Sequence, residues 1–249
     1  MHPPGVKDRR SGEHWAGRLY MREISLRWTR HLVGARVTPN QLTYLMVLAG
    51  LAAGASLLIP GLAGAVLAAV LIQVYLLLDC VDGEVARWRK QTSITGVYLD
   101  RVGHYLAEAG LLTGFGLRAA DLFTRQGDSP NWLWAFLGTV AALGAILIKA
   151  ETDLVDVARI RGGLPAAREE AAAPRSSGLA LARRAASALK FHRLVGGVEA
   201  SLLILVLAVA DAIRGDLFFT RFGVVLLAAI ALVQTLLHLV SILASSRLR

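Results

Sequence analysis

Four ionisable residues have types and spacings suited to binding metal ions and phosphate groups. Asp79 and Asp82 are three residues apart, and Asp100 and His104 are four residues apart. On helices, both spacings place the two side chains on one face. Carboxylate oxygens and imidazole nitrogens bind divalent cations, and paired ions of this kind polarise phosphate groups during displacement at phosphorus. The pattern predicts metal-assisted chemistry on phosphate if the two helices lie side by side.

The residues after Asp82 add groups that suit a phosphate ligand. Gly83 and Ala86 leave helix surface open beside the carboxylates, and Arg87 lies one turn beyond Gly83. A guanidinium can hold phosphate through two parallel hydrogen bonds. From spacing alone, a solvated cluster of charged side chains at the end of a helix is an open alternative.

The segments that must position these residues are strongly apolar. The chain has 249 residues, 55% of them hydrophobic, and a mean hydropathy of +0.53. Residues 37–78 carry no charge and are interrupted only by Pro60-Gly61, which predicts two membrane spans joined by a tight turn. Further apolar segments are 102–117, 129–148, 194–210 and 222–246. We therefore expect an all-α integral membrane protein with six transmembrane helices.

The positive charge predicts how this protein is oriented. The net charge is +9, and basic residues are concentrated in residues 7–36, 87–90 and 159–193, between long uncharged segments. Such clusters mark the cytoplasmic side, so both termini and the polar cluster are expected there in the cell membrane. The same alternation argues against nucleic acid as a partner. The single cysteine, Cys80, excludes an intrachain disulfide.

Two parts of the chain are expected. Residues 1–40 form a basic cytoplasmic arm, in which apolar residues among the arginines of 15–33 predict an amphipathic helix on the membrane surface. A solvated basic arm is the alternative. Residues 41–249 form the six-helix transmembrane catalytic domain, with a cytoplasmic loop at about 161–190.

The segment 79–104 resembles the signature of the CDP-alcohol phosphotransferase family. That signature is D-x-x-D-G-x-x-A-R, a gap of seven or eight residues, and then G-x-x-x-D-x-x-x-D. The residues at its fixed positions are Asp79, Asp82, Gly83, Ala86, Arg87, Gly96 and Asp100, with His104 in place of the last Asp. Thr38-Pro39-Asn40 is similar to a short motif near the start of these enzymes. Elsewhere the resemblance is architectural.

The resemblance implies an enzyme of phospholipid synthesis. It would transfer a phosphatidyl-type group from a CDP-alcohol such as CDP-diacylglycerol to the hydroxyl of an acceptor alcohol and release CMP. Two Mg²⁺ or Mn²⁺ ions and a homodimer among membrane lipids are also implied. The residues implied for metal are Asp79, Asp82, Asp100 and His104; for the nucleotide Asp82, Gly83, Ala86, Arg87, Thr38, Pro39 and Asn40; and for catalysis Asp100 and His104. Gly96 would let two helices approach closely.

His104 is the departure from the family pattern. Neutral imidazole can bind a metal or accept a proton near neutral pH. Loss of one negative charge should weaken Mg²⁺ binding relative to Mn²⁺, Co²⁺ or Zn²⁺. The alternative is a catalytically inactive or repurposed membrane protein that binds CDP-lipid or metal. Glu108, one turn further along, could orient His104, supply the missing carboxylate or serve only in packing.

Two basic residues are candidates for binding the acceptor. Lys149 is expected at the depth of the carboxylates, and Arg193 opens the fifth apolar segment. Both resemble the basic residues of family members that use phosphorylated acceptors such as inositol phosphate or glycerol phosphate. Contact with lipid headgroups is an equal alternative, and the acceptor itself stays open.

Overall fold

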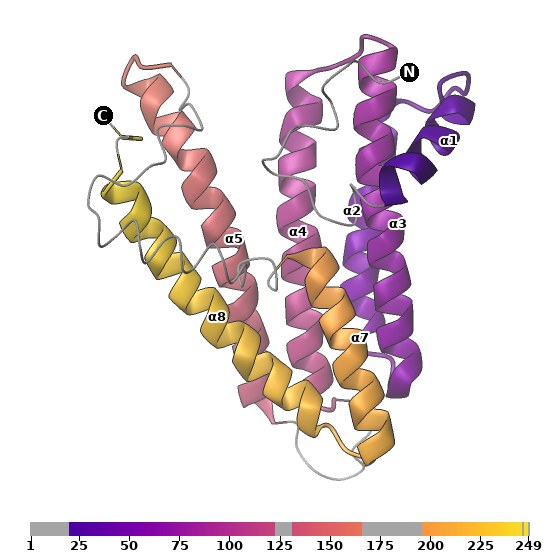
Figure 1. The fold of residues 1–249 in the computed structure, drawn as a ribbon, viewed down its shortest axis with the longest axis vertical. Coiled ribbons are helices and arrows are strands. Elements are labelled where there is room, and N and C mark those ends of the chain that lie inside the picture. Colours follow the sequence, from indigo (N-terminus) through magenta and orange to yellow (C-terminus); the bar gives the residue numbers. More distant parts are fainter. Residues whose placement is uncertain (1–19, 123–130, 166–195, 246, 249) are drawn as a thin grey trace.

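The computed structural model describes residues 20–122, 131–165, 196–245 and 247–248, and the regular elements within these ranges are helices (Figure 1). They are α1 (Arg22–Leu32), α2 (Pro39–Ser56), α3 (Gly61–Trp88), α4 (Ile94–Ala119), α5 (Trp132–Arg161), α7 (Gly197–Arg214) and α8 (Phe218–Leu243). The all-α expectation is confirmed. Each of the six expected apolar segments lies within, or largely overlaps, one of the long helices α2 to α8.

Local signals set the helix boundaries. Thr38 caps α2 through a reciprocal pair of hydrogen bonds with Gln41, and Pro39 follows at the first helical position. Pro60 precedes α3, and Gly61 has a φ of +73°, which glycine adopts without strain, so α2 can reverse directly into α3. Ser93 caps α4 by accepting a hydrogen bond from the Gly96 amide.

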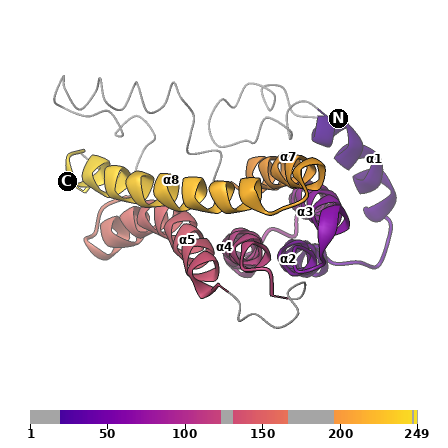
Figure 2. The same cartoon turned by 90° about the horizontal axis from the view of Figure 1, so that it is seen from below.

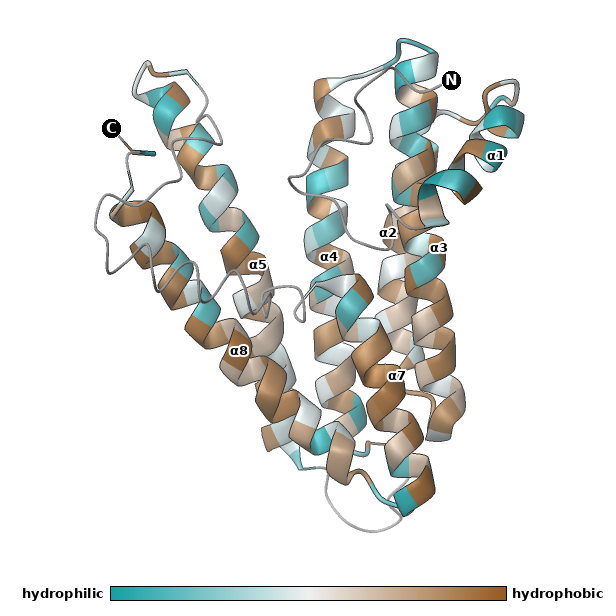
Figure 3. Ribbon diagram, in the orientation of Figure 1, coloured by the Kyte–Doolittle hydropathy of each residue, from teal (hydrophilic) through white to brown (hydrophobic). Residues whose placement is uncertain are grey.

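Three of the described helices, α3, α5 and α8, are long and apolar enough to cross a membrane. Residues along α8 and along the first half of α3 are mostly hydrophobic (Figure 3). Many large apolar side chains on these three helices are exposed, as on a lipid-facing surface. Examples are Val66, Val70, Leu143, Leu147, Leu232 and Leu236. These three helices therefore indicate a membrane protein.

The helices form two groups. α2 packs against both α3 and α4, and α7 packs against α3. α5 and α8 lie side by side, and both lean away from α4 toward their C-terminal ends (Figures 1 and 2). The core between these helices is built largely from Ala and Leu, and Phe115 is the largest of its fully buried side chains. The C-terminal end of α3 and the start of α4 lie at the same end of the bundle.

Glycines allow α2 and α4 to pack in near backbone contact. A methyl group on Gly54 would overlap the backbone of Gly110, and one on Gly114 would overlap the backbone of Gly54. Gly50 faces Ala107 in the same way. The small residues of α2 thus serve a contact within the chain, and this contact sets the distance of α4 from α2.

We predict that Gly54→Ala destabilises the fold by about 1–3 kcal/mol, because the added methyl group meets backbone that cannot move aside. The melting temperature in detergent or nanodiscs, followed by tryptophan fluorescence, measures the effect. Gly34→Ala is the matched control, since nothing lies within 4 Å of its added methyl group. Equal melting temperatures for the two variants would show that the contact tolerates an extra carbon.

Candidate metal and phosphate site

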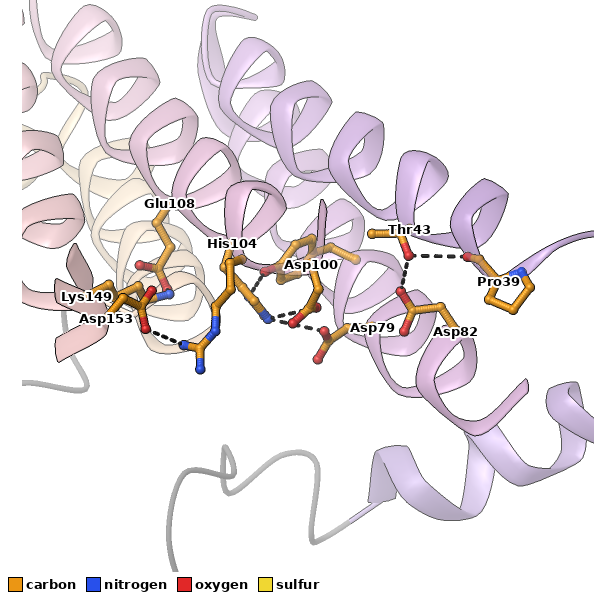
Figure 4. A network of polar contacts seen from close by, with 11 residues as sticks. Pro39, Thr43, Asp79, Asp82, Asp100, His104, Glu108, Lys149 and Asp153 are labelled. Atoms are coloured by element: carbon orange, nitrogen blue, oxygen red, sulfur yellow. Dashed lines mark hydrogen bonds and ion pairs between the residues drawn. The ribbon is translucent and has the colours of Figure 1, made fainter. Parts of the chain in front are cut away.

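Three of the four predicted metal ligands come together between α3 and α4. One ligand atom each from Asp79, Asp100 and His104 lie within 4.8 Å of one another. Nε2 of His104 is 3.3 Å from an oxygen of Asp79 and 3.5 Å from an oxygen of Asp100 (Figure 4). Because α2 packs against both helices, it holds the two carboxylates on facing sides of one cluster.

This cluster has the chemistry of a divalent metal site that a substrate can reach. Two carboxylates and one imidazole nitrogen are donors suited to Mn²⁺ and related ions, and the two negative charges need a cation nearby. The side chains are partly exposed, by 24% for Asp79 and His104 and by 38% for Asp100. The residues present therefore fit a metal ion with open coordination positions.

Asp82 points elsewhere. Its carboxylate is buried, and one oxygen accepts a hydrogen bond of 2.6 Å from the Thr43 hydroxyl on α2 (Figure 4). Thr43 also donates to the Pro39 carbonyl at 3.2 Å. Asp82 is thus linked to the start of α2 and lies outside the three-residue cluster. Thr43 is not among the residues predicted from the sequence, although its position one helical turn after Pro39 indicates that it belongs to the same part of the site.

The other predicted nucleotide residues surround this polar centre. The Arg87 guanidinium lies over Gly83, with Nη1 3.0 Å from the place where a side chain would begin. Arg87 is exposed and Ala86 is partly exposed. Gly83 thus leaves the space that the guanidinium occupies, and the charge remains open to a ligand.

The Thr38-Pro39-Asn40 segment lies beside the start of α4. The side-chain oxygen of Asn40 is 3.4 Å from the position of a methyl group on Gly96. Gly96 therefore lies close to the start of α2. This contact brings the two motifs together in space.

Comparison with known proteins finds a family that this arrangement resembles. The family model for CDP-alcohol phosphatidyltransferase matches residues 36–149. This segment of the chain is thus similar to that family. The matched segment contains both motifs, the metal-ligand cluster and Lys149.

Two curated proteins are similar to part of this chain. The bifunctional IPC transferase and DIPP synthase of Thermococcus kodakarensis and that of Aquifex aeolicus are each 30% identical over 143 residues. The match covers 57% of this chain and 30% of each relative. The chain thus spans less than a third of the curated relatives that it matches.

Solved structures share the fold. The phosphatidylinositol phosphate synthase PgsA1 of Mycobacterium tuberculosis, in complex with manganese and citrate, has a TM-score of 0.58 at 15% identity, over 89% of this chain and 90% of PgsA1. The same protein with CDP-DAG bound has a TM-score of 0.58 at 16% identity, over 90% and 96%. The similarity extends to nearly the whole chain.

A second polar network joins α4 to α5 next to the cluster. Lys149 forms an ion pair of 2.8 Å with Glu108, which also accepts a hydrogen bond from the Gly197 amide at the start of α7. Asp153 pairs with Arg101 at 3.3 Å (Figure 4). Glu108 therefore contacts Lys149 and α7. These contacts do not support a role for Glu108 in orienting His104. Arg193 lies outside the described residues.

Hydrogen bonds hold helix α1 against α3, the helix that carries the first part of the signature. Glu84 of α3 accepts hydrogen bonds from the hydroxyls of Ser25 at 2.8 Å and Thr29 at 2.6 Å, and both of these residues are buried. Arg89 donates to the carbonyls of Leu32, Val33, Ala35 and Val37. The apolar side chains of Ile24, Leu26 and Trp28 are exposed. Polar contacts thus hold α1 to the protein, and these three apolar side chains stay on its outer face.

We predict that Glu84→Ala loosens α1, because two buried hydroxyls lose an ionised partner and hydrogen bonds to charged groups contribute about 1.5–3 kcal/mol. Hydrogen exchange of the α1 amides should accelerate roughly tenfold or more. Glu23→Ala is the control, since Glu23 lies exposed in the first turn of the same helix. Unchanged exchange in Glu84→Ala would mean that Arg89 alone holds the helix.

Proposed function

We propose that this chain is a metal-dependent CDP-alcohol phosphotransferase of phospholipid synthesis. It transfers a phosphatidyl-type group from a CDP-alcohol such as CDP-diacylglycerol to the hydroxyl of a small polar alcohol and releases CMP. The observation that carries the proposal is the meeting of Asp79, Asp100 and His104 within 4.8 Å, inside the segment that the family model matches. The manganese and CDP-DAG complexes of PgsA1, which shares the fold, support it.

Each residue of the site has a proposed role that follows from its position. Asp79, Asp100 and His104 would hold metal ions, with Asp82 as a further ligand, and a bound Mg²⁺ or Mn²⁺ would polarise the phosphates and balance their charge. Arg87 is placed to grip a phosphate with two hydrogen bonds. Gly83, Ala86 and the Thr38-Pro39-Asn40 segment form the surface beside it for the nucleotide.

The transfer itself is a displacement at phosphorus. The acceptor oxygen forms a bond to the β-phosphorus, the bond from this phosphorus to the bridging oxygen breaks, and CMP leaves with that oxygen. The hydroxyl proton passes to a base in the cluster. Asp100 and His104 are the two candidates, and Asp100 is the more exposed of the pair.

We propose in addition that the protein lies in the cell membrane with six crossings. At about 1.5 Å per residue, the 18 residues of α2 and of α7 extend roughly 27 Å, close to the hydrocarbon thickness of a bilayer. Asp100, Arg101 and His104 lie in the N-terminal half of α4, at the end of the bundle that we assign to the cytoplasm with both termini, whereas Arg118 lies in its last turn. A homodimer completes the proposal, and crosslinking in native membranes tests it.

A repurposed binding protein is the second candidate, and the position of His104 favours it. If its ring carries two protons, the positive charge lies between Asp79 and Asp100 and takes the place of a metal ion. Such a protein would bind a CDP-lipid without turning it over. Assay of CMP release distinguishes the two candidates.

We predict that Asp100→Asn lowers CMP release by roughly 100-fold or more, the contribution typical of a positioned acid or base. The assay supplies the purified protein in lipid with CDP-diacylglycerol and Mg²⁺ or Mn²⁺, and with inositol phosphate, glycerol phosphate, serine or inositol in turn. Asp216→Asn, in the exposed loop before α8, is the matched control. Full turnover by Asp100→Asn would overturn the assignment, and CDP-lipid binding without CMP from any acceptor would favour the second candidate.

Lys149 is proposed, with Arg193, to hold the phosphate of a phosphorylated acceptor. Its ammonium group pairs with Glu108. A substrate phosphate would therefore have to bind Lys149 together with Glu108 or displace Glu108 from it. We predict that Lys149→Gln raises the KM for a phosphorylated acceptor about tenfold, the loss of one charge-assisted hydrogen bond. The KM for CDP-diacylglycerol serves as the internal control. An equal rise in both constants would indicate that the residue only maintains the α4–α5 contact.

A further inference from the structure

Tyr75 is a buried residue of α3 that contacts the residue by which this chain departs from the family signature. It lies one helical turn before Asp79, and only 4% of it is exposed. Its hydroxyl forms a hydrogen bond with Nδ1 of His104. The two rings meet edge to face, with centroids 5.7 Å apart and an interplanar angle of 80°. The signature does not include position 75, and the sequence analysis did not single it out.

This contact determines which ring nitrogen of His104 faces the carboxylates. Nδ1 is occupied by Tyr75, and Nε2 is 3.3 Å from Asp79 and 3.5 Å from Asp100. An imidazole has one nitrogen at each side of its ring, so a partner for one nitrogen sets the direction of the other. The ring is thereby held with Nε2 directed into the cluster.

We propose that Tyr75 is the positioning residue that makes His104 a metal ligand through Nε2, in place of the carboxylate that the family signature has there. This inference rests on the proposed metal-dependent function. A ligating imidazole has a free electron pair on the metal-bound nitrogen and keeps its proton on the other, which requires an acceptor. The phenol oxygen of Tyr75 accepts that hydrogen bond from Nδ1.

The need for Tyr75 follows from the replacement of a carboxylate by histidine. A carboxylate has two equivalent oxygens and can bind a metal ion in several orientations, whereas a single imidazole nitrogen must be aimed. A phenylalanine at position 75 would leave the Nδ1 proton without a partner in a buried place. With Nε2 on the metal, Asp100 is the base that takes the proton of the acceptor hydroxyl.

A double-mutant cycle on metal binding tests this role without relying on turnover. Mn²⁺ affinity is measured by electron paramagnetic resonance for the wild type, Tyr75→Phe, His104→Asp and the double variant, each in nanodiscs. We expect Tyr75→Phe to weaken Mn²⁺ binding roughly 10–100-fold, as is typical when the outer partner of a metal-bound histidine is removed. In the His104→Asp background, Tyr75→Phe should weaken Mn²⁺ binding by less than about threefold, because a carboxylate needs no such partner.

Two further readouts separate positioning from packing. Pulsed resonance of bound Mn²⁺ should show coupling to a histidine nitrogen in the wild type, and His104→Asp should abolish it. Tyr44→Phe, on the exposed face of α2, is the matched control for loss of a phenol hydroxyl. Melting temperatures identify any variant that fails to fold, and for such a variant Tyr75→Trp, which keeps a large ring and a polar hydrogen, replaces Tyr75→Phe.

The outcomes distinguish this role from the transferase itself. Equal losses of affinity in both backgrounds, no loss in either, or a wild type without nitrogen coupling would overturn the role of Tyr75. Acceptor-dependent CMP release together with any of these results would leave the transferase standing. Coupling between the two sites without CMP from any acceptor would support the role of Tyr75 and overturn the transferase.

Discussion

Two carboxylates, from Asp79 on α3 and Asp100 on α4, share one cluster with His104 in which the ligand atoms are within 4.8 Å. Like charges at that separation repel, so the helices carrying them must be held together by packing elsewhere and a cation must balance the cluster. The packing is supplied by α2, where Gly50 and Gly54 allow near backbone contact with α4 while the same helix contacts α3. The rigidity of this three-helix unit is the condition for a metal site.

Different charged and polar groups lie on the two sides of the cluster. Arg87 and the start of α2 lie on one side, where Asp82 is fixed by Thr43. Lys149 and the α4–α5 contacts lie on the other (Figure 4). A nucleotide on the first side and an acceptor on the second would meet over Asp100. Glu84 and Arg89 hold α1 at the same end of the bundle. The apolar side chains Ile24, Leu26 and Trp28 of this helix are exposed.

The replacement of the last signature Asp by His104 changes what the neighbouring residues must do. A carboxylate brings charge and two oxygens, whereas His104 brings one directed nitrogen and depends on its contact with Tyr75. The substitution therefore concerns a pair of residues on two helices. A softer and less negative site follows from it, which is why Mn²⁺ is the more suitable probe of this protein than Mg²⁺.

What the sequence by itself determined is local. The uncharged segment 37–78, divided at Pro60-Gly61, predicted α2 and α3, and helical spacing predicted that Asp100 and His104 share a face, because both depend on residues a few positions apart. Only the tertiary structure decided that Asp82 turns to Thr43, that Lys149 meets Glu108, and that Tyr75 holds His104. These partners lie 29 to 41 residues apart, where no periodicity specifies contact, and they are selected by which helices pack together.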